Sequence, residues 1–108
     1  MNRKEFLQRT GKEYRPYFDK LFKQAGERFQ TGPYRSARNQ GHKFTNETDS
    51  RTLCSPDGRA LITFRLDRSL SIDRFGMEVR FENTEQAKQF FEVYPAVLDV
   101  LARQDGLE

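Results

Sequence analysis

The sequence has little of what metal and disulfide sites require. Its 108 residues include one cysteine, Cys54, and one histidine, His42. A lone cysteine cannot form an internal disulfide, so we expect the protein in the reducing cytoplasm. Zinc and similar metals are held by several Cys or His ligands. The sequence therefore predicts no metal site and no cofactor.

A catalytic constellation is also missing. Nucleophilic catalysis needs a nucleophile, a base and an orienting group within reach of one another. A pair formed by Cys54 and His42 across the fold is the one arrangement left open. The ordinary interpretation is a small buried thiol and an imidazole exposed in a polar loop. We therefore predict no catalytic residues and expect that the protein is not an enzyme.

Long hydrophobic runs are absent as well. No apolar stretch approaches the roughly 20 residues that span a bilayer, and no apolar signal core follows the basic N-terminal residues. We expect no membrane partner.

What the chain does have is charge and aromatic rings. Charged residues make up 32% of it and hydrophobic residues 35%, but there are ten Phe and four Tyr. A few large rings can supply much of a small core, so we predict one folded domain over residues 1–108. We give Leu107 and Glu108 no functional weight, since such a pair can be a cloning remnant.

Two helices are predicted at the N-terminus, near residues 3–10 and 14–27. Apolar residues recur there at helical spacing, while Gly11 and Pro16 interrupt the pattern. One kinked helix is the alternative. Turn formers after Gly26 end the helical pattern, and residues 30–50 read as a long, polar, basic loop.

A sheet and a last helix follow. Strands are predicted at 51–54, 60–67 and 75–82, with Met77, Val79 and Phe81 facing inward in the last of them. Leu70 and Ile72 are candidates to extend the pairing. Asn83 or Thr84 can cap a helix that kinks or restarts at Pro95. The predicted fold class is α+β: an N-terminal helix or helix pair, a three-stranded antiparallel meander, and a C-terminal helix packed on one sheet face.

Positive charge gathers in the first half of the chain. Residues 1–50 carry 11 Lys and Arg and 6 Asp and Glu, whereas residues 51–108 carry 8 and 10. The stretch from Arg28 to Asn46 has no acid, and its basic and aromatic residues interleave. Such interleaving is typical of nucleic-acid binding. We predict an anion- or nucleic-acid-binding surface from Arg28, Tyr34, Arg35, Arg38, His42 and Lys43.

Weaker interpretations stay open for parts of this surface. Thr31 to Arg38 resembles a phosphate cradle in residue types but matches no known phosphate-binding fingerprint, and a solvated loop is the plainer interpretation. Tyr14 and Phe29 fit the core better than a binding face, while Tyr34 fits either.

Two functional hypotheses result. In the first, the chain is a non-enzymatic binding domain for an anionic partner, most plausibly nucleic acid, which it contacts through the basic N-terminal half. In the second, it is a protein-protein interaction module, such as a small regulator, an inhibitor or a self-associating domain. That module would use the open sheet face or a sheet edge.

Overall fold

A computed structural model describes residues 1–30 and 41–105. Two helices come first, α1 (Arg3–Arg9) and α2 (Arg15–Phe29), as the sequence predicts. The side chain of Asn2 caps α1 by accepting a hydrogen bond from the Glu5 amide at 2.9 Å. Gly11 takes a backbone φ of +98° between the helices, and Pro16 lies in the first turn of α2, where proline is tolerated.

The sheet has five strands, not the predicted three. They are β1 (Lys43–Asn46), β2 (Ser50–Cys54), β3 (Ala60–Arg65), β4 (Ser69–Ile72) and β5 (Met77–Arg80). They pair antiparallel in chain order, so the predicted meander topology holds. The general class, α+β, is confirmed.

The two strands that were not predicted, β1 and β4, are rich in polar residues. β1 lies inside the stretch that was predicted to be a loop, and only Phe44 in it is apolar. β4 alternates Ser with Leu70 and Ile72, the two candidates to extend the pairing, and it forms a separate strand paired with β3. Arg68, at a left-handed φ of 70°, reverses the chain before β4. Its guanidinium rests 4.4 Å from the centre of the Tyr14 ring.

Two further helices complete the chain, α3 (Thr84–Phe90) and α4 (Tyr94–Gln104). Asn83 caps α3, and its side chain accepts from the Gln86 amide at 2.9 Å. The helical path restarts at Pro95 in the first turn of α4. The predicted C-terminal helix is therefore two helices.

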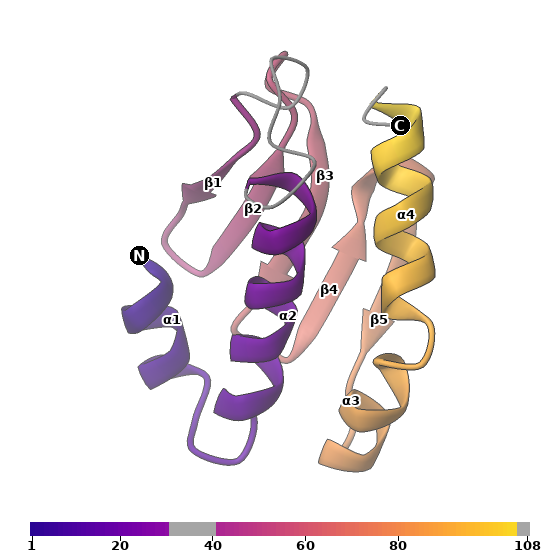
Figure 1. Cartoon of the computed structure of the whole chain (residues 1–108). Coiled ribbons are helices and arrows are strands. Elements are labelled where there is room, and N and C mark those ends of the chain that lie inside the picture. The colour runs from indigo at the N-terminus through magenta and orange to yellow at the C-terminus, as the bar shows by residue number, and fades with distance from the viewer. Residues whose placement is uncertain (31–40, 106–108) are drawn as a thin grey trace.

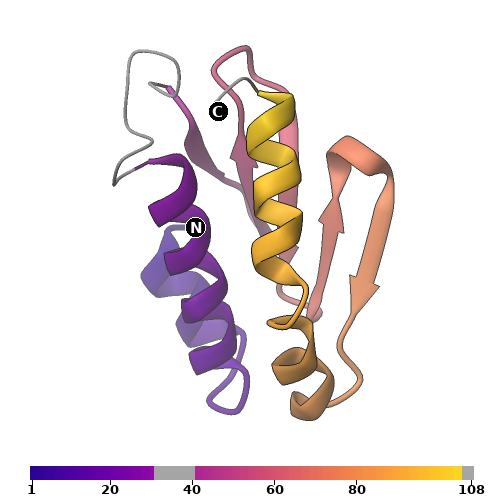
Figure 2. The same ribbon diagram turned by 45° about the vertical axis from the view of Figure 1, so that its right-hand side comes forward.

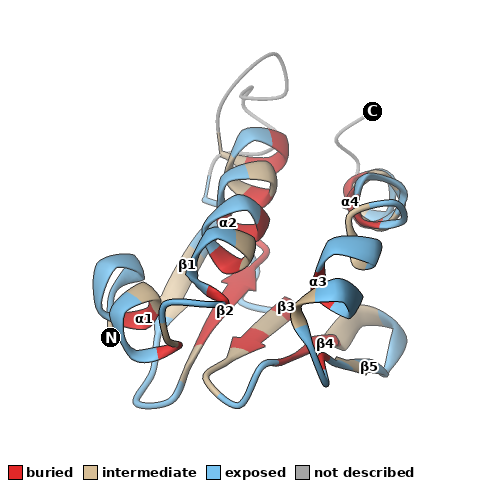
Figure 3. Ribbon diagram, turned by 90° about the horizontal axis from the view of Figure 1, so that it is seen from below, coloured by how far each residue is buried: buried red, intermediate tan, exposed pale blue. Residues whose placement is uncertain are grey.

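All four helices lie on one face of the sheet (Figure 1; Figure 2). Viewed from below, α2 lies above β1 and β2, and α3 and α4 lie above β4 and β5 (Figure 3). The core between the layers is aromatic: the Phe22 ring is 5.1 Å from that of Phe6 and 4.9 Å from that of Phe64. The buried Tyr94 hydroxyl donates to the Leu21 carbonyl at 2.8 Å and ties α4 to α2.

One predicted inward residue is exposed. Val79 is half-buried and Phe81 is buried, but the side chain of Met77 is 56% exposed. Met77 pairs with Ile72 of β4, but it lies on the last strand of the sheet, which has no described strand on its other side. Within residues 1–30 and 41–105, no helix combines the length and apolar character needed to cross a bilayer.

Candidate functional site

The structure describes three of the six residues of the predicted basic surface, and two of these three are buried. Tyr34, Arg35 and Arg38 lie outside the described residues. Lys43 is exposed at the start of β1. Arg28 and His42 are buried, at 8% and 5% exposure.

Arg28 is bound to an acid from the second half of the chain. It lies in the last turn of α2, and its Nε atom is 3.1 Å from Oδ1 of Asp99 on α4. The ion pair crosses the seam between the two long helices. Arg28 therefore has a structural task, because removing either charge would leave the other partly buried without its partner.

His42 was expected in an exposed loop, and this is wrong. Its Nε2 atom is 2.8 Å from Oδ2 of Asp105, and its ring centre is 5.2 Å from that of Phe29. Arg74 holds the second oxygen of Asp105 at 3.0 Å. This cluster links the end of α4 to the start of β1. The buried imidazole has a hydrogen-bond partner there, as buried polar groups require.

A different arginine is the unusual one. Arg51 on β2 is 8% exposed, and its guanidinium lies against two rings, 4.9 Å from the centre of Phe22 and 4.5 Å from that of Phe44. Its Nε atom donates to Oδ1 of Asn46 at 3.1 Å. Its Nη1 atom is buried and has no hydrogen-bond partner among the described residues. No described carboxylate forms an ion pair with Arg51.

Burial makes the charge of Arg51 costly. Desolvation, with a smaller contribution from the positive charge of Arg3, lowers the pKa of Arg51 from 12.5 to about 10. The guanidinium is still charged at neutral pH. A buried cation without a carboxylate is the arrangement that a bound anion would stabilise.

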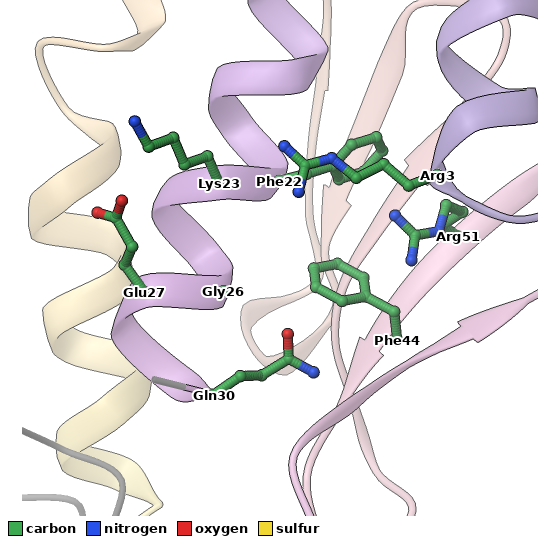
Figure 4. A pocket seen from close by; sticks show the side chains of 8 residues that line it. All are labelled: Arg3, Phe22, Lys23, Gly26, Glu27, Gln30, Phe44 and Arg51. Carbon is green, nitrogen blue, oxygen red and sulfur yellow. The ribbon is translucent and has the colours of Figure 1, made fainter. Parts of the chain in front are cut away.

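Arg51 faces a pocket of about 280 Å³ between the N-terminal helices and strands β1 and β2. Figure 4 shows Arg3 and Arg51 reaching into this space from the same side and Gln30 from below, with the Phe44 ring near them, while Lys23 and Glu27 point away at the rim. Gly26 of α2 lies on the wall. The full lining is Arg3, Phe22, Lys23, Gly26, Glu27, Gln30, Phe44 and Arg51.

Arg3 has a partner that can be displaced. Its Nη2 atom is 2.6 Å from Oδ1 of Asp19, and both side chains are about half exposed, at 44% and 52%. Exposed ion pairs contribute little to stability. Arg3 can therefore exchange part of this contact for an incoming anion without a large loss.

Arg3 also belongs to a second hollow. This one measures about 460 Å³ and is lined by Arg3, Lys4, Leu7, Gln8 and Arg15. The two hollows thus meet at Arg3. Together their linings contain five cations and one acid, Glu27. The pair forms a basic track, defined here as Lys4, Arg15, Arg3, Lys23 and Arg51.

The remaining reactive groups form no site. Cys54 is a buried free thiol. In the part of the chain that the structure describes, no cluster of three or more His, Cys, Asp or Glu side chains is placed to hold a metal ion.

The sequence carried one signal for Arg51. In the predicted strand 51–54, Arg51 shares a face with Leu53, and Leu53 is fully buried. A charged residue at an inward strand position is unusual and points to a special environment. No sequence pattern indicated that Arg3 and Lys23 line this pocket, since their positions depend on how α1 and α2 pack.

Comparison with protein-family models, with curated proteins and with solved structures finds no significant match.

Proposed function

We propose that this chain is a non-enzymatic binding domain for an anionic partner, that nucleic acid is that partner, and that Arg51 holds one of its phosphates. The supporting observation is the buried guanidinium of Arg51, whose Nη1 atom has no partner among the described residues. A phosphate oxygen is the strong, charged acceptor that such a group lacks. The planar fork of arginine suits it particularly.

The shape of the basic track favours an extended anion over a small one. One phosphate in the Arg51 pocket would sit beside Arg3, and the next hollow continues to Lys4 and Arg15. A polyanion that follows the track would meet several cations in succession. Its binding would release counterions at each phosphate.

The sequence-predicted residues fit this proposal only in part. Arg28 and His42 are bound to Asp99 and Asp105, so we assign them to the fold. Lys43 is exposed and stays a candidate contact. Tyr34, Arg35 and Arg38 stay predictions, and we propose the cytoplasm as the compartment because Cys54 is the single cysteine.

Fluorescence anisotropy with labelled oligonucleotides tests the proposal. Single-stranded DNA, duplex DNA and single-stranded RNA are titrated at low salt, next to a poly-glutamate peptide of matched charge. We expect an oligonucleotide to bind, with an affinity that falls steeply as salt is added. Absence of binding to all three would refute the proposal. Tighter binding to poly-glutamate would instead identify an acidic protein as the partner.

The site is located with matched arginine variants. Arg51→Met keeps an unbranched, apolar side chain but removes the guanidinium, and Arg59→Met removes the same charge from an exposed turn. We expect Arg51→Met to lower oligonucleotide affinity about tenfold and to reduce the salt slope by about one phosphate contact. Arg59→Met should lower affinity far less. Equal losses in the two variants would show that only net charge matters.

A further inference from the structure

The outer edge of β5 is open. β5 is the last strand of the sheet, and no described strand pairs with its other side. The Phe81 amide, just after β5, donates to the Arg68 carbonyl at 2.9 Å. Backbone groups of an antiparallel strand alternate in direction. The amides and carbonyls of Val79 and Met77 therefore also face β4, while those of Glu78 and Arg80 face away from the sheet.

The charges on this edge match a second copy of the same edge. If two β5 strands run antiparallel with Val79 opposite Val79, each Glu78 lies opposite an Arg80. Directly opposed residues have Cβ atoms about 4.5–5.5 Å apart, so these pairs would attract. Both side chains are exposed. Because neighbouring strand residues alternate in direction, they lie on the face opposite to that of the half-buried Val79. Among the described residues, Arg80 forms a single long ion pair, with Asp67 at 3.9 Å.

The backbone fits the same register. Glu78 and Arg80 are the residues whose amides and carbonyls point outward, so each opposed pair can exchange two hydrogen bonds. The symmetric Val79 pair then falls at a position without hydrogen bonds, where Cα atoms lie about 4.5 Å apart. A one-residue shift would put these backbone groups out of register.

Exposed apolar side chains gather on this side of the molecule. The exposed large hydrophobic residues among those described are Phe75, Met77, Val93 and Val100. Phe75 and Met77 flank the start of β5, and Val93 and Val100 belong to α4 and the turn before it. All four come from the elements at the β5 end of the sheet, the end opposite α1 and α2 (Figure 3).

The valines face the open edge because α4 is oriented by its ion pair. Asp99 of α4 points to Arg28 of α2. At helical spacing, Val93, Val97 and Val100 lie on the opposite flank of α4, and α4 lies above β4 and β5. A two-fold axis through the paired β5 strands places both α4 helices on the same side of the joined sheet. Their valine flanks would then face each other.

We propose that two copies of this chain associate through their β5 edges, antiparallel and in the register that places Glu78 opposite Arg80. The result is one continuous sheet with the helices of both copies on one side. The Arg51 pockets lie near the far ends of that sheet, so the proposal is independent of anion binding. A dimer, and not a chain of higher order, is expected because a two-fold contact closes on itself.

Charge exchange tests the pairing. Sedimentation velocity is measured for the native chain over a concentration series, and we expect a monomer–dimer equilibrium. Glu78→Arg alone and Arg80→Glu alone should each be monomeric, since each places like charges in opposition. An equimolar mixture of the two single variants should form a heterodimer, and the double variant should dimerise again. The control Glu5→Arg makes the same charge change at an exposed position on α1, at the opposite end of the sheet, and should leave dimerisation unchanged.

Cysteine cross-linking tests the register. In a Cys54→Ala background, Val79→Cys should form a disulfide-linked dimer on mild oxidation, because the two Cα atoms fall within disulfide range. The matched control is Glu78→Cys, which is more exposed and would be favoured by random collision. In the proposed register it lies opposite Arg80 and should cross-link poorly. A native chain that stays monomeric at every concentration, or equal cross-linking of the two variants, would overturn the proposal.

Discussion

Arg28 and Arg51 are buried to the same extent, at 8% exposure, but have different partners. Arg28 lies in the seam between α2 and α4 and is bound to Asp99. Arg51 lies between α2 and the sheet, held by two rings and an amide oxygen, and no described carboxylate pairs with it. Burial alone therefore does not assign a role to a charged residue. The partner does, and the missing partner is what points to a ligand.

Truncating the aromatic core should have the largest effect on stability, because the core supports the surroundings of both Arg28 and Arg51. Phe64→Ala removes a ring that packs 4.9 Å from Phe22, on which Arg51 rests. We expect a loss of about 3–5 kcal/mol in the free energy of unfolding. Urea unfolding followed by circular dichroism measures it. An unchanged midpoint would show that this strand face is not the buried one.

Removing the acid of the Arg28 seam should destabilise the fold without weakening anion binding. Asp99→Ala leaves the guanidinium of Arg28 buried without its carboxylate, at an expected cost of about 1–3 kcal/mol. Oligonucleotide affinity should stay within about twofold of the native value, because the seam is not part of the basic track. A large fall in affinity with unchanged stability would show that Arg28 and Asp99 serve binding and not the stability of the fold.

Adding a methyl group to the wall of the pocket should change stability and oligonucleotide affinity in opposite directions. Gly26 has ordinary helical geometry, and an added Cβ would meet only the Gln30 Oε1 atom, at 3.5 Å. Gly26→Ala should therefore stabilise α2 by about 0.5–1 kcal/mol. It should also reduce oligonucleotide affinity modestly, since the methyl group narrows the pocket. Thermal unfolding and anisotropy on the same samples measure the two effects, and a gain in both would place the ligand elsewhere.

The smallest effects concern residues outside the described ranges. Arg35→Ala and Arg38→Ala test the rest of the sequence-predicted surface. If each contacts one phosphate, each should reduce the slope of log affinity against log salt by about one. Slopes equal to that of the native chain would confine the binding surface to the basic track.

Local patterns predicted the helices well, because α1, α2 and the cap of α3 depend on residues that are close in the sequence. They missed β1 and β4, where serine and threonine alternate with few apolar residues and pairing with neighbours decides the structure. The burial of Arg28 and His42 was not predicted, for a related reason. Their partners, Asp99 and Asp105, are distant in the sequence, and no local pattern indicates which cations the fold will neutralise.

The phosphate-binding role of Arg51 is tested by the unfolding free energy of Arg51→Met, measured with and without an oligonucleotide that binds the native chain. The pKa of Arg51 is lower in the folded protein than in the unfolded chain, so at neutral pH folding must bury a disfavoured charge. We predict that the variant is more stable than the native chain, by about 1 kcal/mol. Added oligonucleotide should stabilise the native chain far more than the variant. A variant that is less stable and gains as much from the oligonucleotide would contradict the account.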